Sequence, residues 1–394
     1  MSGRLKKSHA LYFIYVICVL SLIIAGSEML ARSIWRDKYA QWLEKGVHPF
    51  GYIDRQHLAE RYRPGYKKTI ADILHELESS GKTLSYKQTK EDFKRYNLKA
   101  DDVAMQINRF GLKGPEFSLK PKPGVVRVLT IGDSCTFGSY IDRFSYPRQL
   151  ETLLNSWRPN AFEIINAGHL GYNLQQVLGL LDEWLAFEHS IVILYIGWNR
   201  TILRADPRKS DVLYDQFALY RFYYHAVINR ADLIGHKVLP GRRYDLSDSE
   251  LQTLRSKTFA VDSEYLRKIV LKIRARLPGA KIMLLTLPGL YTTVEPPSRE
   301  DLEKGYATAF STNLAAWPIL SERYNEILRA FAGKEDLVLV DLAKYAEREF
   351  RPRSQFFADS VHPSRLGYFK IAEFLTESIK NELPKSDIQR SDHR

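Results

Sequence analysis

The chain has little of what marks a disulfide scaffold or a metalloprotein. It contains only two cysteines in 394 residues, Cys18 in an apolar run and Cys135 far along the chain, so a disulfide framework is not expected. No HExxH, paired CxxC or similar ligand spacing is present, and these are the patterns that bind zinc. We therefore expect no metal and no cofactor.

The sequence also lacks internal repeats, low-complexity tracts and long blocks of one charge. The net charge is +12, but Lys and Arg alternate with Asp and Glu, as in "EDFKRYNLKADD" and "SREDLEK". This pattern favours a solvated basic surface near anionic envelope material over a nucleic-acid groove. We expect no nucleic-acid partner, and the sequence leaves the oligomeric state open.

The amino terminus is typical of an exported protein. A basic segment, "MSGRLKKSHA", precedes an uncharged apolar run from Ala10 to Ala25, which is long for a signal peptide and short for a membrane span. Ala25-Gly26-Ser27 offers an imperfect cleavage site, and an amphipathic helix continues through Glu28–Arg36. We expect an uncleaved single-pass anchor with its basic end in the cytoplasm and the rest of the chain on the periplasmic side. A cleaved signal peptide is the alternative.

From residue 125 onward, short apolar runs alternate with amphipathic stretches. Runs such as "VVRVLTIG", "FEIINAG", "IVILYIG", "KIMLLTLP" and "LVLVDLA" are separated by helical patterns such as "YPRQLETLLNSW" and "LQQVLGLLDEWL". Continuous apolar strands between helices predict a parallel sheet covered on both faces. In such sheets, ligands bind outside the carboxyl ends of the strands.

A Gly-Asp-Ser corner follows the first of these runs, in "IGDSCTFG". Ser134 at this strand end is a candidate nucleophile, with an N–H that can face a developing negative charge. The alternative is that Asp133 or Ser134 only caps a helix. The small residue Cys135 is interpreted as a packing residue.

Three further motifs lie later in the chain. The first two follow the second and third predicted strands, and the last lies near the carboxyl end. "NAGHLGYN" puts Gly168 and Gly171 in a turn, and "YIGWNR" puts Asn199 where its amide can donate to an oxyanion. "FFADSVHPSRLGY" holds Asp359 three residues before His362, close enough for the carboxylate to orient the imidazole. Each motif alone is also common in ordinary turns, but their order at successive strand ends favours a common site.

These blocks resemble those of the SGNH hydrolases, also called GDSL esterases and lipases. "IGDSCTFG", "NAGHLGY", "IGWN" and "DSVHP" match the four family blocks, and the resemblance covers about residues 105–383. "NRFGLKGPEF" also looks like the lead-in of many membrane-anchored bacterial members. The resemblance implies an α/β, flavodoxin-like three-layer α/β/α fold with a central parallel five-stranded sheet, here preceded by an N-terminal transmembrane helix.

The resemblance also assigns roles. It implies Ser134 as nucleophile, His362 as base and Asp359 as its orienting partner, with an oxyanion hole formed by the N–H groups of Ser134 and Gly171 and the side chain of Asn199. Gly171 is chosen over Gly168 because it directly precedes the polar turn. Arg200 departs from the family pattern, which has an acid there; it is a possible contact for an anionic substrate group or a solvent-facing side chain.

These roles predict acyl-serine chemistry on an O-acylated carbohydrate or lipid of the cell envelope. Water as acceptor makes the enzyme an esterase, and a sugar hydroxyl makes it an O-acetyltransferase; an inactive envelope scaffold is a third possibility. The aromatic segment Leu213–Lys237 is either a lid over the site or a core helix. We divide the chain into a cytoplasmic tail (1–9), an anchor (10–27), a membrane-proximal region (28–124), a catalytic domain (125–383) and a polar tail (384–394).

Overall fold

The computed structural model describes residues 2–44, 51–54, 59–79, 90, 93–199, 217–223, 244–306, 308, 311 and 313–383. Its contacts divide the chain into two compact units. The first comprises Met1–Arg61 and Asp206–Leu239, and the second Tyr62–Ala205 and Pro240–Arg394. The second unit contains the sheet predicted from the sequence.

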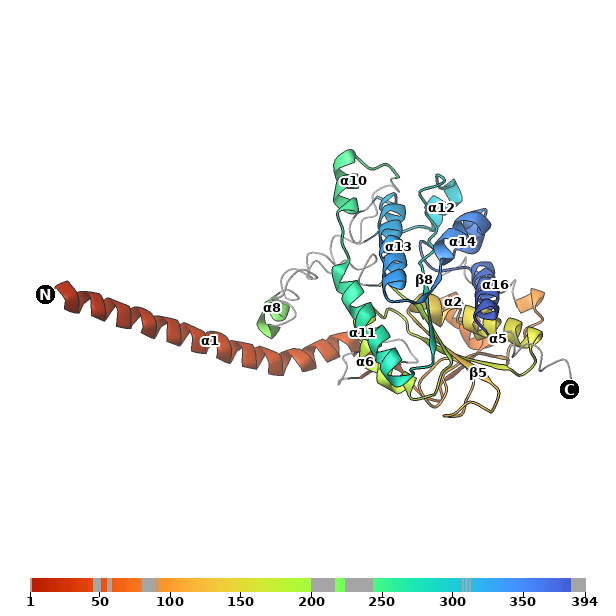
Figure 1. Ribbon diagram of the computed structural model, residues 1–394, viewed down its shortest axis with the longest axis horizontal. Coiled ribbons are helices and arrows are strands. Elements are labelled where there is room, and N and C mark those ends of the chain that lie inside the picture. Colours follow the sequence, from red (N-terminus) through yellow and green to blue (C-terminus); the bar gives the residue numbers. More distant parts are fainter. Residues whose placement is uncertain are drawn as a thin grey trace. The chain divides into compact units, whose positions relative to one another are not determined.

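Five parallel strands form the sheet of the second unit (Figure 1). They are β5 (Val126–Gly132), β6 (Phe162–Gly168), β7 (Ile191–Tyr195), β8 (Lys281–Leu285) and β9 (Val338–Val340). Their spatial order is β6-β5-β7-β8-β9, which is the flavodoxin-like order. β7 is buried along its whole length, as expected for a strand covered on both faces. The predicted fold class is confirmed.

Helices cover the two faces of this sheet. α6 (Leu174–Leu185) packs on α11 (Ala260–Arg276), and α5 (Tyr146–Trp157) packs on α16 (Arg365–Glu382). Figure 1 shows α6, α11 and α13 (Ala316–Lys334) on one side of the sheet and α5 and α16 on the other. Shorter helices fill the connections: α10 (Asp248–Arg255), α12 (Arg299–Lys304), α14 (Leu342–Glu349) and α15 (Arg353–Phe356).

Residues ahead of the first long strand also belong to the second unit. β3 (Lys67–Thr69) pairs antiparallel with β4 (Val103–Gln106), and α2 (Ile70–Ser79) follows β3. Side chains from this region form one apolar cluster with residues of the short 3-10 helix η1 (Asp142–Phe144) and its flank: Ile70, Ile73, Leu98, Ala104, Ile141 and Phe144. The domain bounds given above remain a prediction.

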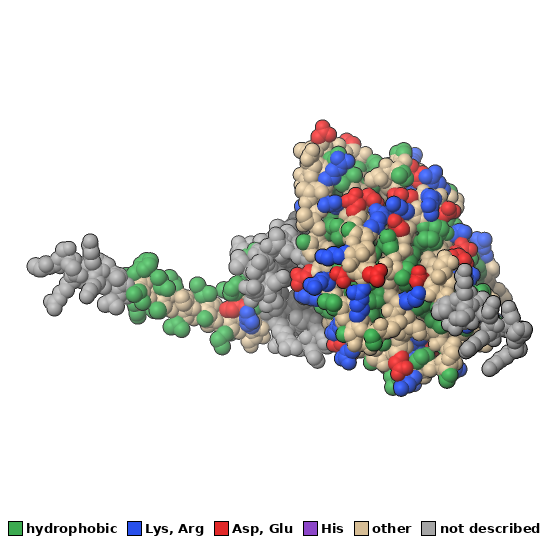
Figure 2. Space-filling view, in the orientation of Figure 1, with side chains coloured by type: hydrophobic (Ala, Val, Ile, Leu, Met, Phe, Trp, Pro, Cys, Tyr) green, Lys and Arg blue, Asp and Glu red, His purple; other side chains and the backbone are tan. Residues whose placement is uncertain are grey.

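In the first unit, α1 (Ser2–Glu44) is one long helix. Its segment Tyr12–Ile34 has a mean hydropathy of 2.2, and apart from Ala31 none of its residues is buried. Figure 2 shows apolar side chains along the helix. The segment is long and apolar enough to be a membrane anchor or a signal sequence.

The Glu28 carboxylate accepts the N–H groups of Ala218 and Leu219 in α8 (Ala218–Tyr223), at 2.8 and 2.9 Å. The strands β1 (Gly51–Asp54) and β2 (Ala59–Tyr62) pair with each other.

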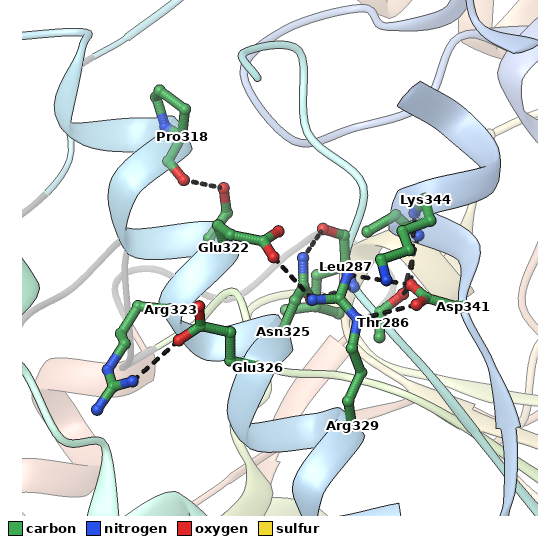
Figure 3. A network of polar contacts seen from close by, with 12 residues as sticks. Thr286, Leu287, Pro318, Glu322, Arg323, Asn325, Glu326, Arg329, Asp341 and Lys344 are labelled. Atoms are coloured by element: carbon green, nitrogen blue, oxygen red, sulfur yellow. Dashed lines mark hydrogen bonds and ion pairs between the residues drawn. The ribbon is translucent and has the colours of Figure 1, made fainter. Parts of the chain in front are cut away.

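A polar network fastens the carboxyl end of β8 to α13 and α14 (Figure 3). The Arg329 guanidinium contacts both Asp341, at 2.8 Å, and Glu322, at 2.8 Å. Asp341 also accepts the hydroxyl of Thr286 at 2.9 Å. The Asn325 amide bonds the backbone N–H and carbonyl of Leu287, at 2.7 and 2.9 Å. These contacts fix the start of the loop that leaves β8.

The surface seen in Figure 2 mixes Lys and Arg with Asp and Glu over the sheet-bearing unit. Such interspersed charge is typical of a solvated surface. Arg200, most of the aromatic segment Leu213–Lys237 and the tail 384–394 lie outside the described residues.

Candidate active site

The Gly-Asp-Ser corner joins β5 to α4 (Ser134–Phe137), a helix of four residues that is separate from α5. Asp133 caps α4, since its Oδ1 accepts the N–H of Cys135 at 2.9 Å. Asp133 and Cys135 are both buried, whereas Ser134 between them is partly exposed. The capping function therefore goes to Asp133, and the Ser134 hydroxyl does not cap the helix.

Ser134, His362 and Asp359 lie in one chain of hydrogen bonds. The Nε2 atom of His362 is 2.7 Å from Ser134 Oγ, and its Nδ1 is 2.8 Å from Asp359 Oδ2. The other oxygen of Asp359 accepts the backbone N–H groups of Val361 and His362, both at 2.9 Å. In this geometry the serine proton can move to the imidazole, and the carboxylate can stabilise the imidazolium that forms.

Hydrogen bonds and charges within this chain shift the pKa values of Asp359 and His362. Burial opposes ionisation of Asp359, but the hydrogen bond and charge of His362 together with two backbone N–H donors lower the pKa of Asp359. Burial also favours the neutral imidazole, yet the hydrogen bond and charge of Asp359 raise the pKa of His362 above its usual value. The His362 side chain keeps 31% of its surface exposed, so that a substrate can reach it.

Two further predicted residues lie at neighbouring strand ends. Gly171 is in the turn after β6, with φ of +72° and open space where a Cβ would project, so a ligand can approach its backbone. The buried Asn199 follows β7, and its Nδ2 donates to the carbonyl of Tyr172 at 3.2 Å. An amide nitrogen carries two hydrogens, so a second donor remains after this bond.

Gly168 has a different function from Gly171. A Cβ at Gly168 would lie 2.1 Å from the backbone nitrogen of Phe137, so glycine is needed there for α4 to approach the end of β6.

Cys135 is buried, and its Sγ donates to the carbonyl of Val361 at 3.5 Å. Burial raises the pKa of this thiol, which keeps it protonated.

Sequence reasoning missed Tyr62, which comes from the region ahead of the sheet. Its hydroxyl accepts the N–H of Leu170 at 2.7 Å, its ring stacks on His169 with centroids 4.5 Å apart, and it meets Phe137 edge-on. Tyr62 thus supports both the turn that holds Gly171 and the helix that begins at Ser134. No local motif marks it, because the contact depends on how the chain folds back.

Within the described ranges, no group of three or more His, Cys, Asp or Glu side chains could hold a metal ion. Arg200 lies outside these ranges, so its position relative to Asn199 is not described.

Three solved structures illustrate what the fold is similar to. A lipase/acylhydrolase from Enterococcus faecalis is 16% identical, with a TM-score of 0.40, covering 66% of this chain and 98% of its own. An acetylxylan esterase from Geobacillus stearothermophilus is 15% identical, with a TM-score of 0.40, covering 64% and 94%. A member of the lipolytic G-D-S-L family from Veillonella parvula is 14% identical, with a TM-score of 0.38, covering 64% and 97%. A search of curated proteins gave no match.

The family assignment rests on the sequence itself. The model of the GDSL-like lipase/acylhydrolase family matches residues 130–369, a range that contains Ser134, Gly171, Asn199, Asp359 and His362 and covers more than half of the chain. The chain therefore belongs to the GDSL-like lipase/acylhydrolase family, and the protein is an SGNH-type ester hydrolase.

Proposed function

We propose that the protein transfers an acyl group from an O-acylated carbohydrate or lipid of the cell envelope to Ser134 and then to water. The observation that carries this proposal is the hydrogen-bonded chain from Ser134 through His362 to Asp359, with contacts of 2.7 and 2.8 Å. Such a chain activates a serine that is otherwise a weak nucleophile.

In the proposed first step, His362 Nε2 takes the hydroxyl proton as Ser134 Oγ attacks the ester carbonyl. The oxyanion of the tetrahedral intermediate is bound by the N–H groups of Ser134 and Gly171 and by the Asn199 amide. Collapse breaks the ester C–O bond, and His362 returns its proton to the leaving alcohol. In the second step, His362 takes a proton from a water molecule as the water oxygen attacks the acyl-serine carbonyl. Collapse of this second tetrahedral intermediate breaks the bond between the acyl carbon and Ser134 Oγ, His362 returns the proton to Oγ, and the carboxylic acid is released.

An acceptor other than water would turn the same steps into acyl transfer. A sugar hydroxyl at the acyl-serine makes the enzyme an O-acetyltransferase, so the chemistry of the site serves both reactions. The envelope substrate is inferred from α1, whose segment Tyr12–Ile34 is apolar and, apart from Ala31, not buried. A membrane helix ahead of the catalytic unit would hold the site near acylated envelope polymers.

The test uses the full-length protein in detergent. A fluorophosphonate probe should label the wild type but not Ser134→Ala. This result would contradict the alternative that the protein is an inactive scaffold. Release of acyl groups from acetylated glycans and p-nitrophenyl esters, with and without sugar acceptors, then separates hydrolysis from transfer. Free acid in both conditions supports the esterase; acyl groups recovered on the sugar support the transferase. Equal labelling of the wild type and Ser134→Ala would refute the proposal.

A further inference from the structure

Lys113 is a buried cation that the catalytic steps do not use. In the sequence it lies between β4 and β5. The whole residue is 2% exposed to solvent, and its side chain is fully buried. Its backbone forms isolated bridges to Ile107 and to Asn166 of β6. A lysine is seldom fully buried without a partner that compensates its charge.

The ammonium group of Lys113 contacts the segment that directly follows Ser134. Its Nζ donates to the carbonyl of Phe137 at 2.8 Å and to the carbonyl of Ser139. It lies 4.3 Å from the centroid of the Phe137 ring, a favourable cation–π distance. The Asn166 amide donates to the same Phe137 carbonyl at 3.4 Å. Two buried polar side chains therefore meet the carboxyl end of α4.

This end of α4 needs such partners. The last carbonyls of a helix accept no hydrogen bonds from within the helix, and they carry its negative pole. α4 has only four residues and begins at Ser134, so any movement at Phe137 is passed to Ser134 within one turn. A buried cation bound to the Phe137 carbonyl limits that movement.

Charged groups from two neighbouring elements face Lys113. Asp142 of η1 lies 3.5 Å from Nζ, and Arg148 of α5 contacts the same Asp142 at 3.6 Å. Burial lowers the pKa of Lys113 to about 8, Asp142 opposes this shift and Arg148 adds to it. Below this pH the ammonium form predominates, so the contacts with the two carbonyls are charge-assisted.

We propose that Lys113 is a positioning residue for Ser134: its ammonium group binds the Phe137 and Ser139 carbonyls and so holds α4 with the serine hydroxyl facing His362. The contacts of Lys113 are with the Phe137 and Ser139 carbonyls, the Phe137 ring and Asp142, so in this proposal it acts through α4 and not on the reacting atoms. The inference rests on the proposed function, because it requires Ser134 to be the nucleophile. A misplacement of about 1 Å at a reacting group can cost on the order of 100-fold in rate.

The experiment compares three variants at pH 7 on a p-nitrophenyl ester. Lys113→Met removes the charge and keeps an unbranched side chain, and Lys113→Arg keeps the charge. Lys68→Met is the matched control, because Lys68 is a mostly buried lysine on β3 that pairs with Glu76 instead of α4. We measure kcat, KM, the rate of fluorophosphonate labelling, and folding by circular dichroism.

Lys113→Met should lower kcat and the labelling rate about 10- to 100-fold with KM within about twofold, and Lys113→Arg should recover most of the loss. Lys68→Met should keep the wild-type kcat. If Lys113→Met does not fold, Lys113→Gln, which keeps a neutral donor, should show a smaller loss in the same two rates.

Equal kcat in the Met variants at positions 113 and 68 would overturn the inference, as would a loss that Lys113→Arg does not reduce. Wild-type kcat in Lys113→Gln would do the same. These outcomes are distinct from failure of the proposed function, which is read from Ser134→Ala. If the probe still labels Ser134→Ala, the assignment of the nucleophile fails. If the probe does not label Ser134→Ala while Lys113→Met keeps the wild-type kcat and labelling rate, only the inference about Lys113 fails.

Discussion

His362 Nε2 lies 2.7 Å from Ser134 Oγ, although the two residues are 228 positions apart in sequence. Ser134 stands at the end of the first strand of the sheet, and His362 precedes its last helix. The contact therefore forms only when the first and last parts of the α/β unit have folded together. Because β5 lies between β6 and β7 inside the sheet, local unfolding of the segment that carries His362 should abolish activity while β5 is still paired.

Substitutions in the hydrogen-bonded chain should act as one unit. Ser134→Ala and His362→Ala should each lower kcat on a p-nitrophenyl ester by about 10³-fold or more, and Asp359→Asn by a similar or smaller factor. Ser364→Ala is the control, because Ser364 caps α16 and should affect stability alone, by about 1 kcal/mol. Unchanged turnover in folded Ser134→Ala would contradict the assignment.

Loss of the Asn199 amide should slow catalysis more than it weakens binding. We expect Asn199→Ala to lower kcat about 10²- to 10³-fold with little change in KM, because an oxyanion donor acts mainly in the transition state. Asn173→Ala is a matched control, since Asn173 caps α6 and accepts the N–H of Gln176. An increase in KM alone would instead make Asn199 a substrate-binding residue.

The rate of probe labelling should rise with pH as His362 loses its proton. Because Asp359 raises the pKa of His362, the midpoint of this rise should lie above 6.5, the usual value. Asp359→Asn removes the raising influence, so its midpoint should move to lower pH while the maximal rate falls. Labelling rates between about pH 5 and 9 measure both quantities. The same midpoint in both proteins would show that Asp359 does not control this titration.

Asp341 should contribute stability that depends on pH. Burial opposes its ionisation, but Arg329 and Thr286 outweigh this and lower the pKa of Asp341. A carboxyl with a lowered pKa stabilises the folded state above its unfolded pKa and loses that effect as the pH falls. At pH 7, Asp341→Asn should lower the free energy of unfolding by about 1 to 2 kcal/mol, and the difference should shrink below the ordinary pKa of 3.8.

Chemical denaturation at pH 7 and at acidic pH measures this effect. The control is Glu326→Gln, because Glu326 forms an exposed pair with Arg323 on the same helix and should change stability by less than about 0.5 kcal/mol. A constant difference between Asp341→Asn and the wild type across this pH range would contradict the prediction.

Membrane attachment through α1 is a separate prediction. We expect the mature protein in the membrane pellet with Met1–Arg36 still attached, and reporters fused after Arg36 and after Leu383 active only outside the cytoplasm. Fractionation and amino-terminal sequencing test this. A soluble species beginning near Gly26 or Glu28 would show that the segment is a cleaved signal peptide.

Sequence patterns were sufficient for the sheet because its central strands are buried on both faces. A strand such as β7, buried along its length, requires a short continuous apolar run, and turn residues on either side of such a run distinguish it from a helix. The five strands and their main helices were therefore predictable. The short helices α10 and α12 were not predictable, because they are polar insertions too short to show a helical repeat of apolar residues.

The same limit applies around the site. Asp359 and His362 form their contact within three residues, so a local motif could indicate it. Tyr62 and Lys113 reach the segment after Ser134 from a region with weak periodicity. Their importance depends on tertiary contacts that no spacing records. The choice between Asp133 and Ser134 as helix cap was likewise settled only by the hydrogen bond to Cys135.

The pairing of the central strands has a consequence for how such a protein can diversify. Gly132 is the register partner of both Gly168 and Tyr195, so backbone ladders set the spacing of the turns that carry Ser134, Gly171 and Asn199. The connections beyond those turns do not set this spacing. Evolution can lengthen or exchange them, and with them the range of acceptable esters, while the reacting groups stay in place.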